Sequence, residues 1–329
     1  MRVLVTGASG RIGANIVHKL IEGGHRVRAA IRPDTPRKAK LSPFPTEIVE
    51  ADLRDREALM RAVAGMEAVV HNGVIFTGDP AEMVAGSLEA TATLLEAARR
   101  NGCARFIFIS STAVYEGTAY RPGDPVREEE AAPEITNVYG ACKLGAEALC
   151  NAYQRQHGLP CLSLRYPMVT AGAELLEHGF LLEAWHNEAA REKSPEQAAW
   201  RKAIQEAWEQ GKRLVVPLNA DGSAWKRHFC DVRDAAQAVA LSLETVEAPG
   251  RAYNIASVPI RYDEAATTLA ELSGWDIAEI PFPEDYRYHF ALDRAAEFLG
   301  YVPAFTGPQM IHDAWRARQG QPVENLIAP

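Results

Sequence analysis

The stretch Thr6-Gly7-Ala8-Ser9-Gly10-Arg11-Ile12-Gly13 decides the fold of this chain. An apolar run at residues 3–5 precedes it, and apolar residues at helical spacing follow it over residues 12–21, so the order is strand, glycine-rich turn, helix. Glycines let such a turn adopt positive φ and approach a ligand closely, while the helix N-terminus attracts a pyrophosphate. This context favours a dinucleotide site over a purely structural turn. The residues predicted to form it are Gly7, Ser9, Gly10, Arg11, Ile12 and Gly13.

Strand and helix patterns alternate after this turn. Short apolar runs, each typical of a buried strand, are separated by longer stretches with helical spacing. This alternation is typical of a parallel sheet with right-handed crossovers. We therefore expect an α/β fold, with a doubly wound parallel-sheet Rossmann domain and a smaller mixed C-terminal substrate domain. The expected strands of the main sheet are residues 3–5, 26–31, 47–50, 68–71, 106–109, 161–164 and 252–256.

The domain boundaries follow from where these patterns stop and resume. We expect the dinucleotide-binding Rossmann domain to comprise residues 1–169 plus 226–256, and the substrate domain to comprise residues 170–225 plus 257–310. The last stretch, residues 319–329, has little periodicity and is expected to be a poorly ordered tail.

Composition narrows the classes of function. The chain has 329 residues and a formal net charge of -8, which weighs against a nucleic-acid partner. Its five cysteines are odd in number and lack C-x-x-C spacing, so neither disulfides nor a metal site is indicated. No signal-peptide pattern or membrane-length apolar run is present. We expect a cytoplasmic protein with a small-molecule substrate, no membrane partner and no metal.

The end of the second strand bears on the choice of cofactor. An NAD enzyme carries a carboxylate there for the ribose hydroxyls, whereas this chain reads Ile31-Arg32. Arg32, followed by further cations in a proline-rich loop, offers a guanidinium to a 2'-phosphate. We predict NADP, with NAD as the alternative. A solvated basic loop is the other interpretation, because Asp34 lies close enough in sequence to turn inward.

Other strand ends should face the same edge of the sheet. A carboxylate at Asp52 suits an adenine amino group, although Asp52 or Asp55 could instead cap the helix that follows. Ligands bind at the carboxyl ends of strands in open α/β sheets. The further residues predicted at this edge are Leu53, Asn72, Gly73, Val74, Ser110 and Ser111.

Tyr139 and Lys143 are the candidate proton-transfer pair. They are four residues apart, so on a helix they share a face. A nearby ammonium stabilises phenolate, so we expect Lys143 to lower the pKa of Tyr139. Such a phenol can exchange a proton with a hydroxyl or a carbonyl, which is the chemistry of alcohol oxidation or ketone reduction. The plainer interpretation is a solvated pair with no function.

Together these motifs resemble the extended short-chain dehydrogenase/reductase superfamily, within its NAD-dependent epimerase/dehydratase group. The segment Arg227-His-Phe-Cys-Asp-Val-Arg-Asp234 and the Leu-Gly-x-x-Pro turn ending at Pro303 extend the resemblance along nearly the whole chain. It implies that Tyr139 is the general acid/base and that Lys143 binds the nicotinamide ribose. It also implies a homodimer through the helices that carry Leu94 and Tyr139. The implied substrate residues are Ser111, Thr112 and Arg227, and the implied nicotinamide contacts are Tyr166, Pro167 and Val169.

Departures from the family pattern limit the function. Dehydratases carry an acid pair where this chain has Thr112-Ala113, so a dehydratase is not expected. Epimerases place asparagine at the position of Met168 to hold a substrate diphosphate, so that clamp is weakened. Arg227 matches the family's diphosphate arginine, yet it would equally suit a smaller carboxylate or phosphate, or a structural pair with a nearby aspartate.

Three functions follow from these observations. The first is an NAD(P)-dependent oxidoreductase that transfers a hydride between nicotinamide and a secondary alcohol or ketone, on a sugar-derived or small hydroxy compound. The second is a nucleotide-sugar epimerase, which oxidises and re-reduces one substrate. The third is a non-catalytic dinucleotide-sensing regulator, which the presence of both Tyr139 and Lys143 disfavours.

Overall fold

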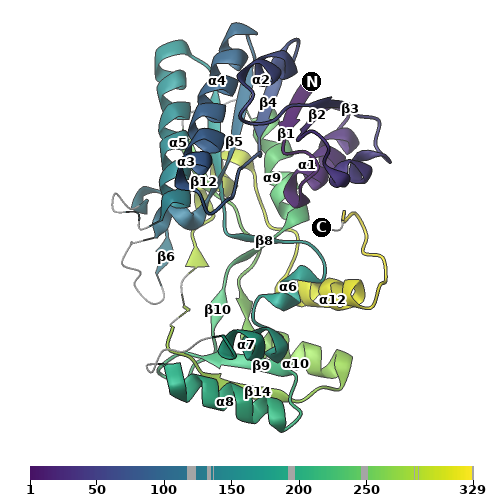
Figure 1. Ribbon diagram of the computed structural model, residues 1–329, viewed down its shortest axis with the longest axis vertical. Helices are drawn as coiled ribbons and strands as arrows, with labels where there is room; N and C mark the ends of the chain where they lie inside the picture. Colours follow the sequence, from purple (N-terminus) through teal and green to yellow (C-terminus); the bar gives the residue numbers. More distant parts are fainter. Residues whose placement is uncertain are drawn as a thin grey trace.

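The computed structural model describes residues 1–116, 124–131, 135, 137–191, 197–245, 251–284, 286–287 and 289–327. Two lobes are visible in Figure 1, an upper one built on a large sheet and a lower one built on a small sheet flanked by helices. The N-terminus and the C-terminal end both lie at the upper lobe.

The upper lobe is organised around a parallel sheet of seven strands, in the order β12-β7-β5-β4-β1-β2-β3. The chain order reverses on either side of β1, which makes the sheet doubly wound and confirms the predicted fold class. Strand β12 pairs in parallel with β7, which confirms the predicted return of the chain to the main sheet. The strands are β1 (Arg2–Thr6), β2 (Arg26–Ile31), β3 (Glu47–Glu50), β4 (Ala68–His71), β5 (Arg105–Ser111), β7 (Cys161–Tyr166) and β12 (Arg251–Asn254).

Helices cover both faces of this sheet, because successive strand residues point to opposite sides. Val3 and Val5 of β1 belong to the core beneath one set of helices, whereas Leu4 belongs to the core beneath the other set. The first set is α1 (Arg11–Glu22), α9 (Val232–Glu244) and α11 (Asp293–Leu299). The second set is α2 (Arg56–Val63), α4 (Ala90–Arg100) and α5 (Val138–His157).

The lower lobe has its own hydrophobic core, which contains the buried Trp200, Ile204 and Trp225. Its sheet pairs β9 (Leu214–Leu218) with β14 (Ile277–Pro281) in parallel. The helices packed around it are α6 (Glu174–Glu177), α7 (Leu182–Ala189), α8 (Ala198–Glu209), α10 (Tyr262–Ser273) and α12 (Gly307–Arg318). The lobe draws on separate parts of the chain, and the predicted domain boundaries stay a proposal.

Three further pairs of short strands and several short helices complete the fold. Parallel pairs are formed by β8 (Met168–Thr170) with β11 (Phe229–Asp231) and by β6 (Pro125–Val126) with β15 (His289–Phe290). An antiparallel pair is formed by β10 (Lys226–Arg227) and β13 (Ile260–Arg261). The short helices are η1 (Pro36–Leu41), α3 (Pro80–Val84), the π-helix η2 (Ala85–Glu89), η3 (Thr112–Tyr115) and η4 (Glu128–Glu130).

The C-terminal segment differs from its expected disorder. Residues 320–327 run from α12 back to α1 (Figure 1). There the buried Asn15 side chain accepts from the backbone N–H of Ile327 and donates to its carbonyl, both at 3.0 Å. The Asn15 amide gives the backbone of Ile327 one donor and one acceptor, as a neighbouring strand would. The sequence of the segment itself does not indicate this contact, because the contact depends on a residue far away in the chain.

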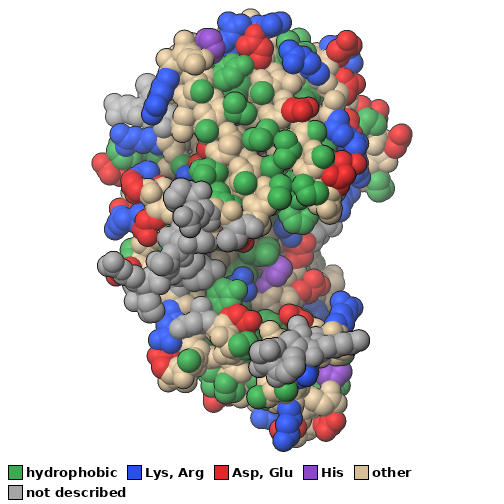
Figure 2. Space-filling view, turned by 60° about the vertical axis from the view of Figure 1, so that its left-hand side comes forward, with side chains coloured by type: hydrophobic (Ala, Val, Ile, Leu, Met, Phe, Trp, Pro, Cys, Tyr) green, Lys and Arg blue, Asp and Glu red, His purple; other side chains and the backbone are tan. Residues whose placement is uncertain are grey.

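One face of the upper lobe carries many hydrophobic side chains between its charged ones (Figure 2). Val84 at the end of α3 and Val138 at the start of α5 are 38% and 40% exposed. The homodimer that the family resemblance implies would use α4 and α5, and it stays a prediction. Among the described residues, no helix combines the length and the apolar character of a membrane span.

Candidate active site

The glycine-rich turn brings the backbone of two strand ends together. Gly7 has a φ of +62°, and a Cβ there would lie 2.8 Å from the Cα of Gly73 at the end of β4. A Cβ on Gly13 would overlap the carbonyl of Gly7, so glycine also allows α1 to start directly against the turn. Helix α1 begins at Arg11 without a side-chain cap, which leaves its first N–H groups directed toward the turn.

A cavity of about 660 Å³ lies along this turn and the neighbouring strand ends. Its volume lies within the range of ligand-binding cavities in proteins. Most of the predicted cofactor residues line it: Gly7, Ser9, Gly10, Arg11, Ile12, Arg32, Asp52, Leu53, Asn72, Gly73 and Val74. The prediction missed five polar or aromatic lining residues, which are Thr35, Arg54, Phe76, Thr77 and Glu82, and also Glu174 from the lower lobe.

Three cationic side chains from the segment after β2 line the cavity. Arg32, Arg37 and Lys40 line it together, as expected for the end of β2. The pKa of Lys40 is lowered by partial burial and by the neighbouring charge of Arg37. Lys38 is not among the lining residues, and its ammonium lies 3.9 Å from Glu50.

The two carboxylates after β3 have different surroundings, which confirm Asp55 as the helix cap and leave the adenine contact of Asp52 a prediction. Asp55 caps α2 by accepting from the N–H of Ala58 at 2.9 Å. Asp52 lines the cavity and accepts from Nε and Nη2 of Arg54 at 2.9 and 3.0 Å. These hydrogen bonds hold the pKa of Asp52 below its usual value.

An ion pair connects the glycine-rich turn to the lower lobe. Nη1 of Arg11 lies 2.8 Å from Oε2 of Glu174, the first residue of α6. Glu174 also accepts from the backbone N–H of Ala171. Both side chains line the cavity, so its wall includes both lobes.

The three predicted catalytic side chains meet at the next strand end. Ser111 ends β5, and Tyr139 and Lys143 lie on successive turns of α5. Asn137 caps α5 by accepting from the N–H of Gly140 at 2.7 Å. The hydroxyls of Ser111 and Tyr139 share a hydrogen bond, and Ser111 Oγ also accepts from the N–H of Ala113.

Lys143 is buried beside this hydrogen bond. Its Nζ donates to the carbonyl of Ile109 at 2.7 Å and lies 5.7 Å from the centre of the Tyr139 ring. Burial lowers the pKa of Lys143 to about 8, and the carboxylate of Glu147 opposes this shift.

The expected lowering of the Tyr139 pKa is wrong for this structure. Burial raises the pKa of Tyr139, and only the hydrogen bond with Ser111 opposes that rise. The sequence places Lys143 one turn away but cannot show that both groups lose water on folding. The ring of Phe76 adds to this burial, because it packs edge to face on Tyr139 at 5.4 Å.

Several residues expected at the nicotinamide end turn their side chains elsewhere. The Tyr166 hydroxyl donates to the carbonyl of Ala235 on α9, and Val169 packs in the core under α1 and α9. Ser110 is buried and donates to Glu147 at 2.5 Å. The side chains of these three residues therefore point away from the strand ends, and their backbone stays there. Tyr166 is the neighbour of Ser111 in the pairing of β7 with β5.

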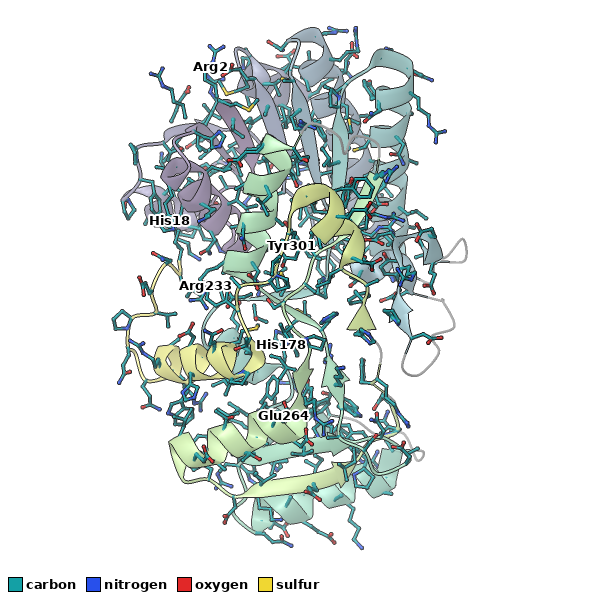
Figure 3. The ribbon with its side chains drawn as sticks, turned by 180° about the vertical axis from the view of Figure 1, so that it is seen from behind. Arg2, His18, His178, Arg233, Glu264 and Tyr301 are labelled. Atoms are coloured by element: carbon teal, nitrogen blue, oxygen red, sulfur yellow. The ribbon has the colours of Figure 1, made fainter. Side chains whose placement is uncertain are left out.

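Arg227 lies at the junction of the two lobes. Its guanidinium carbon is 4.7 Å from the ring centre of Tyr286 and 5.3 Å from that of Phe229. Burial lowers the pKa of His178, and the positive charge of the nearby Arg227 lowers it further. Figure 3 shows His178 between the two lobes. Asp231 pairs with Arg233 instead, at 2.8 Å. Arg227 therefore lies against two aromatic rings on the lower lobe's side of the junction.

Comparisons with known proteins agree with this geometry. Residues 3–256 match the model of the NAD dependent epimerase/dehydratase family. A UDP-glucose 4-epimerase of Streptomyces lividans is 26% identical over 98% of this chain and 97% of its own length. A 3-beta-hydroxysteroid dehydrogenase of Mycolicibacterium neoaurum is 30% identical over 50% of this chain and 46% of its own length.

A solved structure matches nearly the whole chain. It is a short-chain dehydrogenase/reductase superfamily protein from Agrobacterium tumefaciens with bound NAD, 30% identical, with a TM-score of 0.81. The match covers 97% of this chain and 98% of that one.

Proposed function

Because the chain belongs to the NAD-dependent epimerase/dehydratase family, we propose that it is an NAD(P)-dependent oxidoreductase acting on a secondary alcohol or ketone. The observation that carries the proposal is the hydrogen-bonded pair Ser111 and Tyr139 beside the buried Lys143. These three residues do not line the cavity themselves, but the ring of Phe76, which does, packs on Tyr139. A bound nicotinamide supplies or accepts the hydride. The chain's own residues position the carbonyl and move the proton.

Each side chain has a distinct part in the proposed reaction. Ser111 hydrogen-bonds the substrate oxygen and fixes its distance from the phenol. Tyr139 transfers the proton between its hydroxyl and that oxygen. Lys143, as an ammonium held by the carbonyl of Ile109, would bind the nicotinamide ribose, as the family resemblance implies.

The lining of the cavity supports a dinucleotide. Gly7 and Gly10 line it without side chains and α1 begins beside them, so a pyrophosphate would lie against backbone N–H groups at the helix N-terminus. Arg32, Arg37 and Lys40 would hold a 2'-phosphate, which supports NADP. NAD is the alternative, supported by the NAD bound in the A. tumefaciens relative.

A nucleotide-sugar epimerase is the second candidate. It is supported by the UDP-glucose 4-epimerase relative, which matches this chain over 98% of its length. Arg227 would then hold the substrate diphosphate. The exposed Met168 beside the same junction suits that role less well than a polar residue.

Replacing Tyr139 with Phe tests the proposal. Wild type is assayed with NADP and NAD against aryl ketones, hydroxy acids and UDP-glucose. We expect Tyr139→Phe to lose about 10³-fold in kcat, because it removes general acid–base catalysis and leaves the cavity unchanged. Tyr153→Phe on the same helix is the matched control and should keep kcat.

The products separate the two candidates. Net change in cofactor absorbance with a ketone or alcohol supports the oxidoreductase, whereas UDP-galactose formed without net cofactor change supports the epimerase. Full turnover by Tyr139→Phe would refute both assignments of the phenol.

A further inference from the structure

A buried ion pair lies directly behind the proposed catalytic residues. Nε and Nη2 of Arg165 on β7 donate to the two oxygens of Glu147 on α5, at 2.9 and 2.6 Å. Both residues are only 4% exposed. A buried ion pair adds little net stability, since desolvation offsets the attraction, so its place in the molecule calls for another explanation.

The pair holds the strand end that carries Ser111 from both sides. On one side, Ser110 donates to Oε1 of Glu147 at 2.5 Å. On the other side, Nη1 of Arg165 donates to the hydroxyl of Tyr115, the last residue of η3, at 2.9 Å. Ser111 lies between these two anchored residues.

The pair also holds the helix that carries Tyr139 and Lys143. Glu147 is one turn beyond Lys143 on α5, so its two hydrogen bonds with Arg165 fix this helix against β7. Three further bonds extend the anchorage toward the outer strand: Arg165 donates to the carbonyl of Glu128, Tyr115 donates to Asn254, and the backbone of Asn254 donates to Glu128.

We propose that Glu147 and Arg165 are positioning residues, which hold Ser111, Tyr139 and Lys143 at the mutual distances that proton transfer needs. This inference rests on the proposed function. A bidentate guanidinium–carboxylate pair defines direction as well as distance, so it sets the rotation of α5 relative to β5 and β7. A displacement of about 1 Å in such an array costs on the order of 10²-fold in rate.

Arg165→Lys is the decisive variant, since it keeps the buried positive charge and loses the bidentate hydrogen bonds to Glu147. We expect kcat to fall about 10²-fold while KM stays within about 3-fold. The matched control is Arg233→Lys, because Arg233 makes buried bonds to Asp231 and Asp313 at 2.8 and 2.6 Å (Figure 3). This control should lose thermal stability to a similar extent and keep kcat.

Glu147→Gln gives a readout that altered folding alone would not move. Lys143 is faced by Tyr139, Cys142 and Glu147 from α5 and by His71 from β4. Of these, Glu147 is the larger influence that raises the Lys143 pKa, so its neutralisation should lower that pKa further below about 8. Activity that needs the ammonium is lost as pH rises through this pKa, so the alkaline limb of kcat should move to lower pH.

A substrate-free titration separates this inference from the proposed function. Tyr139 ionisation is followed by tyrosinate absorbance, as the difference between each protein and its Tyr139→Phe form. Arg165→Lys should ionise Tyr139 at a higher pH than wild type does, because a displaced Ser111 no longer offers the hydrogen bond that opposes the raised pKa of the phenol. This result is expected even if no ketone in the panel is turned over. Equal kcat losses in Arg165→Lys and Arg233→Lys, or an unmoved Tyr139 titration, would overturn the positioning role.

Discussion

Arg32 is the residue whose chemistry bears most directly on cofactor choice. It follows the last residue of β2, where its guanidinium lines the cavity together with Arg37 and Lys40. A carboxylate at this place would repel a 2'-phosphate, whereas a guanidinium can bind it with two hydrogen bonds. The local charge therefore supports NADP.

Arg32→Ala should weaken NADP far more than NAD. A hydrogen bond to a charged group contributes about 1.5–3 kcal/mol, so we expect a 10- to 100-fold rise in Kd for NADP. The Kd for NAD should change by less than about 3-fold, because NAD has no phosphate there. Calorimetric titration of both cofactors measures this. The control is Lys38→Ala, which alters a nearby cation outside the cavity lining and should leave both Kd values unchanged. An equal rise in Kd for NADP and NAD in Arg32→Ala would contradict the NADP proposal.

At the scale of elements, the junction of α5 with η3 fixes the distance between the phenol and the serine. Gly140 is the residue that allows this contact, since a Cβ there would lie 2.6 Å from the carbonyl of Ala113. A backbone carbonyl cannot move aside as a side chain can. Any larger residue must shift the helix away from Ser111.

Gly140→Ala should therefore reduce kcat although alanine is the better helix former. We expect a loss of about 1–3 kcal/mol of stability from overpacking and at least about 10-fold in kcat from the displaced phenol. The control is Gly145→Ala on the same helix, whose Cβ would meet only the flexible end of Leu88 at 3.0 Å. Denaturant unfolding and steady-state kinetics on both variants measure the two effects. If Gly140→Ala kept wild-type kcat, the contact would not control the catalytic geometry.

Local sequence signals predicted the elements far better than the contacts between them. The glycine turn, the strand ends and the Tyr139–Lys143 spacing are readable because each depends on a few neighbouring residues. The Glu147–Arg165 pair is not readable, since 18 positions separate two residues whose pairing depends on how α5 packs on β7. The direction of the Tyr139 pKa shift failed for the same reason, because burial is a property of the packed molecule.

At the scale of the whole molecule, two contacts on α1 connect the lobes. Arg11, its first residue, pairs with Glu174 of the lower lobe, and Asn15, one turn later, binds the C-terminal segment that leaves α12. The Asn15 amide also donates to the carbonyl of Arg11 at 2.9 Å. The segment that carries the dinucleotide turn is thus tied to the lower lobe at both positions.

Asn15→Ala should destabilise the protein through the C-terminal segment. It removes both hydrogen bonds with Ile327, so we expect a loss of about 2 kcal/mol in the free energy of unfolding. Removing residues 320–329 should cost a similar amount, because it deletes the partner of the same amide. In the shortened chain, Asn15→Ala should then cost markedly less than in the full chain, since interacting sites are not additive. Urea unfolding of the four proteins measures this cycle, and full additivity would show that Asn15 acts independently of the segment.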